Sequence, residues 1–456
     1  MIGLVKNAFK GKEKRGEFIF HSFGEKEYGK GNLFPASYHN CDFRGGVIRG
    51  GIGLKKYLNE NGEHLAMSMT VNAGAPHTFF VTLNKDGVQA NTTGIYLVGT
   101  DGYLYLRRDD GSPWQRISIG NNVEHCAMRN EKKAVYNFFC GAKTVYSTQD
   151  GAVFKNMFTI ENVGGCVCNK RYFLLSKSGD LHYTAVLDPH STDIVDLNGA
   201  GRIYLPIKYG APTGIKEYCG AVYIFFKKGI CKLTVSANPM ENVMKEIAYH
   251  GGDICLRGQA VTSDGIIFLA NEGAYYLRND RVERICEHLS IGPCATNKNC
   301  GVGYCDDLVI FSYYRDKDGT AENCRLVLYA DGKDGYFSES YGALSGNKYT
   351  YIGGRFYCYA KDNVGIQHGK SCFFASEEVA FATEKSKRLK TLLLKGEGSV
   401  TVGVKCGERE RKYPLVFKNG VAKIKAREKG KSFSFNFYLD AGSLVSGMKI
   451  EYVTEG

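Results

Sequence analysis

The 456-residue sequence has little tryptophan and proline, and it contains no long apolar run. A single Trp, Trp114, stands against 30 Tyr and 26 Phe, and there are only 9 Pro. No stretch of about 18 consecutive apolar residues occurs, so we expect no membrane-spanning helix. The N-terminal stretch MIGLVKNAFKGKEKRGEF becomes charged at Lys6 and lacks the apolar centre of a signal peptide. We therefore expect the chain to be made and assembled in the cytoplasm.

Motifs that carry common chemistry are also missing. The 16 Cys include no C-x-x-C pair. The two closest, Cys166 and Cys168, are separated by one residue. Neither H-x-H nor H-E-x-x-H occurs, and there is no G-x-S-x-G or phosphate-binding P-loop. The ten His are scattered at His21, His39, His64, His77, His125, His182, His190, His250, His288 and His368. We expect no catalytic, cofactor-binding or metal-ligating residues and no enzymatic activity, with most cysteines serving as small buried hydrophobes.

Three segments come near a functional motif. Ser147–Phe154 approaches the Asp-box of sialidase propellers, but Asp150 and Gly151 are adjacent where the motif separates them, which favours a plain turn. The Gly-rich run Gly45–Gly53 is a weak candidate for phosphate binding, because it opens no helix after a strand. The turn Asp109-Asp110-Gly111 offers carboxylates to a cation, but a solvated hairpin end is the better interpretation.

Tyrosine, phenylalanine and glycine are abundant, with 56 Gly in all. Aromatic residues favour pleated strands, and glycine supplies the turns between them. One pattern, an apolar strand followed by a Gly turn and an aromatic strand, recurs at Ile95–Leu106, Val145–Phe154, Phe173–Tyr183, Val222–Leu233, Ile266–Leu277 and Leu326–Phe337. The turn glycines, Gly102, Gly151, Gly179, Gly229, Gly273 and Gly335, are spaced by 49, 28, 50, 44 and 62 residues. A four-stranded propeller blade takes about 40–50 residues.

This pattern predicts an all-β protein with a β-propeller of six or seven blades. Runs such as Ala221–Phe226 are apolar throughout, as in strands that are covered on both faces. We expect an extended N-terminal arm over residues 1–70, the propeller over residues 71–375 and a β-sandwich over residues 376–456. A pair of sandwiches or a β-helix is the alternative for the middle region.

The C-terminal region alternates clearly. Phe433, Phe435 and Phe437 face one way, with polar residues between them, which predicts a half-buried antiparallel strand. The turn Lys418-Asn419-Gly420 is a hairpin signal. This region is also basic, because residues 384–456 carry 16 Lys and Arg against 8 Asp and Glu, or +8 of the net +12. Such a charge suits nucleic acid or an acidic protein surface, although a solvated face explains it equally well.

Three stretches resemble tailed-bacteriophage propeller-type virion proteins, namely the tail nozzle, tail hub and stabilisation proteins. Asn40–Gly53 resembles their N-x-D-F-x-x-G-x-L-x-x-G-x-G opening. Gly251–Cys255 with Ile266–Tyr275 is similar to a G-C … lyFls-x-x-G-v-Y blade, although Asp253 and Ile254 separate the Gly from the Cys. Ser446–Tyr452 looks like the closing strand of their C-terminal sandwich.

The resemblance implies a structural virion protein in the tail or head–tail connector. It implies a homo-oligomeric ring, with a hexamer favoured, around the path of DNA ejection. Portal, adaptor or tail proteins would be its partners, with non-specific DNA contact, and the virion its location. Two alternatives stay open: a receptor- or glycan-binding propeller at the tail tip, and a propeller hydrolase with acidic and basic groups converging at the central channel.

Overall fold

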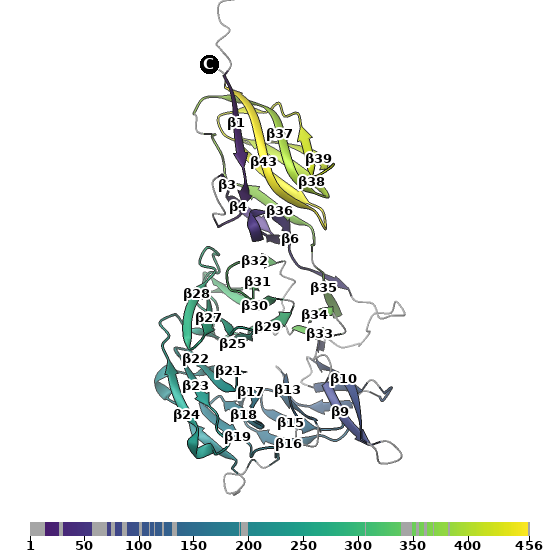
Figure 1. Cartoon of the computed structure of the whole chain (residues 1–456), viewed down its shortest axis with the longest axis vertical. Coiled ribbons are helices and arrows are strands. Elements are labelled where there is room, and N and C mark those ends of the chain that lie inside the picture. The colour runs from purple at the N-terminus through teal and green to yellow at the C-terminus, as the bar shows by residue number, and fades with distance from the viewer. Residues whose placement is uncertain are drawn as a thin grey trace, which may run out of the picture. The chain divides into compact units, whose positions relative to one another are not determined.

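The computed structural model describes residues 14–454 apart from 27–30, 57–70, 74–77, 84–88, 100–102, 109, 114, 121–122, 130–134, 191, 193–198, 306, 339–348, 353–354, 360–362, 368 and 382–383. The chain divides into two compact units. One unit comprises Leu54–Asp334 and Ser340–Ile366, and the other comprises Met1–Gly53, Gly335–Glu339 and Gln367–Gly456. Figure 1 shows that strands dominate both units.

Seven antiparallel sheets follow one another along the described part of the middle region. The first has the order β12-β11-β10-β8, with β9 also paired to β10. Its strands are β8 (Val71–Ala73), β9 (Thr78–Leu83), β10 (Gln89–Gly99), β11 (Tyr103–Arg108) and β12 (Gln115–Ser118). The second consists of β13 (Glu124–Arg129), β14 (Val135–Cys140), β15 (Thr144–Thr148) and β16 (Lys155–Thr159). The third consists of β17 (Asn162–Cys168), β18 (Arg171–Ser176), β19 (Asp180–Tyr183) and β20 (Gly201–Tyr204).

The later sheets repeat the same order. The fourth consists of β21 (Pro212–Tyr218), β22 (Ala221–Phe226), β23 (Gly229–Thr234) and β24 (Val243–Ile247), flanked by the 3-10 turns η2 (Ile207–Tyr209) and η3 (Pro239–Glu241). The fifth consists of β25 (Ile254–Val261), β26 (Ile266–Ala270), β27 (Gly273–Arg278) and β28 (Arg281–Ile285). The sixth consists of β29 (Gly301–Cys305), β30 (Leu308–Lys317), β31 (Thr320–Tyr329) and β32 (Gly335–Ser338). The seventh combines β33 (Tyr349–Ile352), β34 (Arg355–Tyr359) and β35 (Asn363–Gln367) with β7 (Gly53–Lys56).

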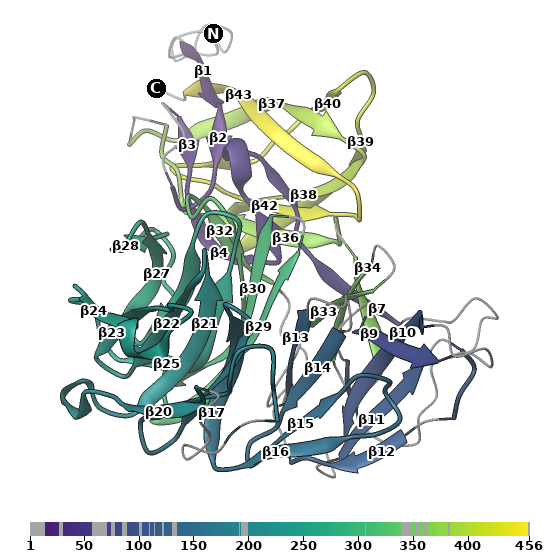
Figure 2. The same cartoon turned by 60° about the horizontal axis from the view of Figure 1, so that its bottom comes forward.

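These sheets are the blades of a β-propeller. The first strand of each sheet from β13 onward lies beside the first strand of the next, in the series β13, β17, β21, β25, β29 and β33, and Figure 2 shows these strands around a common centre. Contacts of β34 with β8 and of β14 with β9 close the circle. The strand β7 precedes the first blade in sequence but pairs with β35 in the last blade. The circle of blades is therefore closed by pairing between an early and a late strand. The expected all-β propeller is therefore present, with seven blades among the described residues.

Apolar contacts between neighbouring blades hold the ring together. In β22, Val222, Ile224 and Phe226 belong to the core shared with β17 and β18. The alternate residues Ala221, Tyr223 and Phe225 belong to the core shared with β25 and β26. Both faces of this strand are buried, as the continuous apolar run predicted. Burying one phenylalanine side chain contributes about 1.5–3 kcal/mol.

The second unit is a sandwich of two sheets. One sheet has the order β40-β37-β43-β6-β5, with β1 paired to β43 and β41 to β37, and the other has the order β39-β38-β42-β36-β4. The N-terminal strands are β1 (Lys14–Phe20), β2 (Ser22–Phe23), β3 (Asn32–Leu33), β4 (Pro35–His39), β5 (Cys41–Asp42) and β6 (Ile48–Gly50), with the 3-10 turn η1 (Arg44–Gly46). The C-terminal strands are β36 (Cys372–Ser376), β37 (Lys387–Glu397), β38 (Ser399–Cys406), β39 (Arg409–Val416), β40 (Val421–Ile424), β41 (Lys429–Gly430), β42 (Ser434–Leu439) and β43 (Leu444–Thr454).

The described part of residues 1–53 differs from an extended arm. Lys14–Phe20 pairs residue by residue with Met448–Thr454, and β4 pairs with β36. The sandwich therefore draws strands from both ends of the chain, and the propeller is inserted between them in sequence. This difference has a physical origin: Phe18 and Phe20, at alternate positions of β1, pack against the sandwich core, and pairing with β43 satisfies the backbone of β1.

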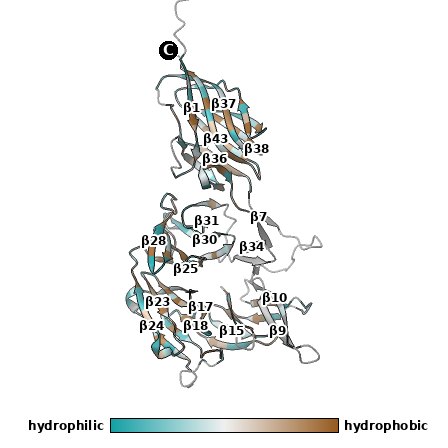
Figure 3. Cartoon of the chain, in the orientation of Figure 1, coloured by the Kyte–Doolittle hydropathy of each residue, from teal (hydrophilic) through white to brown (hydrophobic). Residues whose placement is uncertain are grey.

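Phenylalanine fills the sandwich core. Phe433, Phe435 and Phe437 are fully buried, as their alternation predicted, and they meet Leu392, Leu394 and Ile450 of the opposite sheet. In Figure 3, β37, β38 and β43 carry hydrophobic and hydrophilic residues along the same strand. The predicted hairpin at Lys418-Asn419-Gly420 forms with φ of 51° at Asn419 and 75° at Gly420, the double positive φ of a type I′ turn.

Candidate functional site

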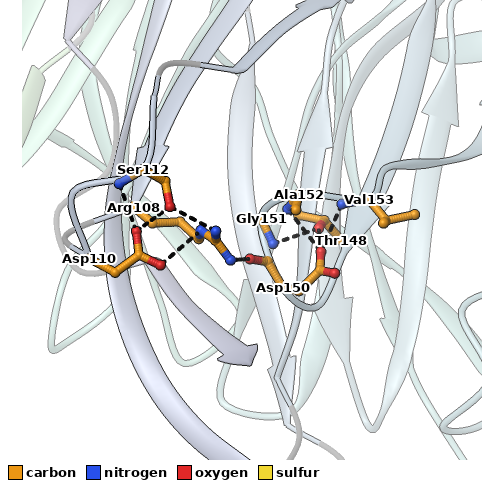
Figure 4. Close-up of polar contacts among 8 residues, drawn as sticks. All are labelled: Arg108, Asp110, Ser112, Thr148, Asp150, Gly151, Ala152 and Val153. Atoms are coloured by element: carbon orange, nitrogen blue, oxygen red, sulfur yellow. Dashed lines mark hydrogen bonds and ion pairs between the residues drawn. The ribbon is translucent and has the colours of Figure 1, made fainter. Parts of the chain in front are cut away.

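The Asp-box-like segment forms a self-contained turn between β15 and β16. Oδ1 of Asp150 accepts hydrogen bonds from the backbone N–H groups of Ala152 and Val153, each at 2.8 Å. The Thr148 hydroxyl accepts a hydrogen bond from the Gly151 N–H at 2.9 Å. Figure 4 shows these side chains folded onto their own turn. Asp150 therefore stabilises its own turn, as the sequence indicated.

Arg108 joins this turn to the corresponding turn of the first blade. Its Nη1 donates to the Asp150 carbonyl oxygen at 3.3 Å, and its Nε lies 3.3 Å from Oδ2 of Asp110 (Figure 4). Hydrogen bonds from Ser112, together with the Arg108 charge, lower the pKa of Asp110 below its ordinary value. The acidic turn considered for a cation therefore has its Asp110 carboxylate occupied by Arg108 and Ser112, while Asp109 lies outside the described residues.

The histidines are dispersed over both units. His125 is the most perturbed, because burial lowers its pKa to about 4. Its Nε2 lies 3.0 Å from Oδ1 of Asn137, and its ring packs against Tyr96 and Phe139. Within the described parts of the chain, no three His, Cys, Asp or Glu side chains are grouped to hold a metal ion. His64, His77 and His368 lie outside those parts.

Most described cysteines are buried, and all of them are free thiols. Burial raises the pKa of Cys231 to about 11 and that of Cys168 to about 12. A raised pKa keeps the thiol protonated at neutral pH, and a protonated thiol is a poor nucleophile. These residues pack as small hydrophobes.

Close packing accounts for the Gly-rich run Gly45–Gly53. A Cβ at Gly50 would lie 1.5 Å from the Lys370 carbonyl oxygen, and one at Gly51 would lie 2.4 Å from the Tyr336 ring. Asp42 accepts a hydrogen bond from the Arg44 N–H and pairs with Arg49 at 3.5 Å. The run therefore folds η1 and β6 against their own unit.

The innermost strands of the propeller bring charged residues of three blades together. Glu124 on β13 lies 4.0 Å from Lys216 on β21 and 4.0 Å from Arg257 on β25. The blade between them contributes Gly164, where a Cβ would lie 2.9 Å from a Glu124 carboxylate oxygen. Because Gly164 has no side chain, Glu124 can extend past β17. The negative charge of Glu124 is compensated by Lys216 and Arg257.

A bulge in β25 places Arg257. Ile254 pairs with Ala270 but Gln259 pairs with Phe268, so residues 255–258 leave the ladder. Arg257 has φ of 57°, a left-handed conformation that is uncommon outside glycine. Bulges of this kind re-aim side chains. Sequence reasoning missed this cluster, because its three members come from strands about 40 to 130 residues apart and share no local pattern.

The predicted basic region is concentrated on one edge of the sandwich. Ten Lys and Arg and three Glu occupy residues 405–431, which gives this stretch a net charge of +7. It contains β39 and β40, the outer strands of the two sheets, and β41. The type I′ turn joins β39 to β40, and Figure 2 shows the two strands at the same side of the sandwich. We call residues 405–431 the basic edge.

Comparison with known proteins identifies no family. No family model matches the chain, and no curated protein matches it. Solved structures align with this chain at 8–11% identity. BBS1N in complex with ARL6DN gives a TM-score of 0.41 over 66% of this chain and 94% of that chain at 11% identity. BamB from Moraxella catarrhalis gives a TM-score of 0.41 at 10% identity, covering 71% of this chain and 99% of that chain. The WD40 β-propeller domain of Doa1 gives a TM-score of 0.39 at 10% identity, covering 65% of this chain and 95% of that chain.

In the described residues, no helix is long and apolar enough to cross a membrane.

Proposed function

We propose that this chain is a structural virion protein of a tailed phage, without catalytic activity. It forms a symmetric ring, with a hexamer favoured, in the tail or head–tail connector around the DNA path. Portal, adaptor or tail proteins are its neighbours in this proposal.

The observation that carries the proposal is the way the sandwich secures both ends of the chain. Seven consecutive residues of β1 pair with β43, and β6 also pairs with β43. Within the propeller, β7 fastens the last blade to the start of the chain. A part that transmits force during DNA ejection has to resist unravelling from its ends, and long antiparallel ladders supply that resistance.

The sequence resemblance supports the same role, since the Asn40–Gly53 stretch ends the N-terminal segment of this unit and directly precedes the propeller in sequence. Ring formation follows the general rule that a heterologous interface whose rotation closes generates a cyclic oligomer. A rigid propeller and a sandwich offer large surfaces for such interfaces.

The test is the mass and shape of the purified chain. Light scattering over rising protein concentration and electron micrographs of the most concentrated sample are expected to show closed rings of uniform subunit number. A chain that stays monomeric at the highest concentration, alone and with candidate portal or tail proteins, would overturn the proposal.

A receptor- or glycan-binding role is the second candidate. Tyr204 on the outer strand of the third blade is 76% exposed, and the Arg202 guanidinium lies 4.7 Å from the centre of its ring. Exposed aromatic faces stack on sugar rings. Binding on a glycan array that is lost in Tyr204→Ala would favour this role, and an array without binding would remove it.

A further inference from the structure

We propose that the basic edge binds the phosphate backbone of double-stranded DNA without reading its sequence. The inference deepens the proposed function and rests on it for the presence of DNA beside the protein. Its own basis is the arrangement of charges on β40 and the residues that follow.

Strict alternation aims a row of cations outward. Ala422, Ile424 and Ala426 are buried in the sandwich core. The residues between and after them are exposed, and they are Lys423, Lys425 and Arg427. The strand β40 ends at Ile424, but buried and exposed residues continue to alternate as far as Arg427, so these three cations lie on the side away from the core.

The row continues onto neighbouring structure. Lys395 on β37 is exposed and pairs with Val421, at the start of β40. Lys418, in the turn before β40, is exposed as well. The positive charge therefore extends along the edge and across to the next strand.

Two of the three carboxylates in the basic edge are hydrogen-bonded to other side chains, and the third, Glu408, lies in the turn before β39. Glu428 accepts a hydrogen bond from the Tyr413 hydroxyl, and Glu410 accepts one from the Asn436 amide at 2.8 Å. Lys423, Lys425 and Arg427 have no ion pair with any described residue. Their charges are available to an external anion.

The charge of the row suits a nucleic-acid backbone. Its cations follow one another on one exposed side of the chain, and a run of neighbouring phosphates is the regular polyanion that such cations neutralise. Lysine and arginine side chains that contact phosphates position a protein on DNA, but they do not distinguish one base sequence from another. The two aromatic residues of the basic edge, Tyr413 and Phe417, are half-buried against the sandwich core, which leaves little ring surface for unpaired bases and favours duplex over single-stranded DNA.

A protein partner is the less suitable occupant. Specific protein interfaces centre on buried aromatic or arginine anchors surrounded by apolar contacts. The exposed apolar side chains beside the row are the two valines Val416 and Val421. A row of exposed positive charges complements a regular polyanion more closely than it does such an interface.

The experiment measures binding of the full chain to a fluorescent duplex of arbitrary sequence, at salt concentrations from about 50 to 200 mM. The test variant carries Lys423→Gln, Lys425→Gln and Arg427→Gln. The matched control carries Lys143→Gln, Lys177→Gln and Lys208→Gln, which removes the same charge from exposed lysines that pair with Glu161 or Glu246. A third variant, Lys423→Arg with Lys425→Arg, keeps the charge.

We expect the test variant to bind the duplex at least tenfold more weakly than the parent chain at the lowest salt concentration. We also expect the slope of log K against log salt concentration to become shallower by about 2.7, which is 0.9 for each lost phosphate contact. The control and the arginine variant are expected to bind like the parent chain. Unchanged binding in the test variant would overturn the proposal, as would tighter binding of single-stranded DNA or of an acidic polypeptide of equal charge. Lysines on an edge strand also block edge-to-edge aggregation, and a test variant that aggregates while the soluble fraction binds DNA normally would assign them that role instead.

This result is separable from ring formation. Subunit number is measured by mass without DNA, so the basic edge can fail the binding test while the ring forms, and the reverse can also occur.

Discussion

Single residues in this protein show how burial decides between chemistry and packing. His125, the cysteines and Asp150 each belong to a residue type that catalyses reactions or binds metals elsewhere. In this chain a neutral histidine packs against Tyr96 and Phe139, thiols fill core space, and Asp150 caps its own turn. Buried cysteines and a plain turn at Asp150 were predicted from the sequence, since no C-x-x-C pair occurs and the Asp-box spacing is broken. The packing of His125 was not predicted.

The convergence of Glu124, Lys216 and Arg257 could not be predicted at this scale. Each residue alone is an ordinary charge in a strand. Their meeting depends on blade order, on Gly164 and on the bulge before Gln259, and none of these is visible as a local pattern.

At the residue scale, His125 makes stability depend on pH. In the unfolded chain a histidine titrates near 6.5, whereas in the folded chain the pKa of His125 is about 4. Below pH 6.5 the unfolded form therefore binds a proton that the folded form does not, so the free energy of unfolding falls as the pH drops towards 4. The loss is expected to be about 2–3 kcal/mol and is measured by urea unfolding at pH 7 and pH 4.5.

The lowered pKa values of His182 and His190 act in the same direction. His125→Gln should flatten the pH dependence, while the control His250→Gln, at an exposed position, should keep it. A parent chain equally stable at both pH values would contradict this assignment.

At the scale of elements, hairpins were predicted well and their place in a blade was not. The six hairpins found in the sequence join the second and third strands in some blades, as at β22–β23, and the third and fourth in others, as at β15–β16. The spacing of their glycines was irregular for this reason, although the blades follow one plan. Alternation also identified β42 correctly, since periodicity of two is a local property.

The alternation in β42 gives the second prediction. Phe435→Ala removes a fully buried ring from the sandwich core, and it is expected to lower the free energy of unfolding by about 3–5 kcal/mol. Ser434→Ala, at the neighbouring half-buried position on the other face, is expected to change it by less than about 0.5 kcal/mol. Equal losses in the two variants, measured by denaturant unfolding, would show that β42 does not bury this face.

At the scale of the whole chain, the propeller and the C-terminal sandwich were predictable, and the role of the N-terminal strands was not. The pairing of Lys14 with Thr454 joins residues from opposite ends of the sequence. Only three residues of β1 are apolar, Phe18, Ile19 and Phe20, and so short a run does not identify a pairing partner. A Gly-rich segment is compatible with an arm or with tight packing. Only the three-dimensional structure distinguishes the two.

Removing the N-terminal strands tests their contribution to the sandwich. Deletion of residues 1–23 removes β1 and β2, with the buried Phe20 and Phe23. We expect the sandwich to unfold at a temperature lower by at least about 5 °C, while the propeller transition stays in place. Differential scanning calorimetry measures both transitions, and deletion of residues 1–13, which keeps every described strand, is the control. An unchanged calorimetric profile after the longer deletion would mean that β1 and β2 are dispensable.

The fastening of both chain ends also sets an order in time. On the ribosome β1, β4 and β6 emerge before the propeller, whereas their partners β36 and β43 emerge only after all seven blades have been made. The strand β7 likewise waits for β35. During synthesis the backbone N–H and C=O groups of these early strands are unpaired, so the strands can pair with a neighbouring chain on the same polysome. A chaperone that covers β1, β4 and β6 until β36 and β43 have been made is therefore expected to raise the yield of correctly folded chain.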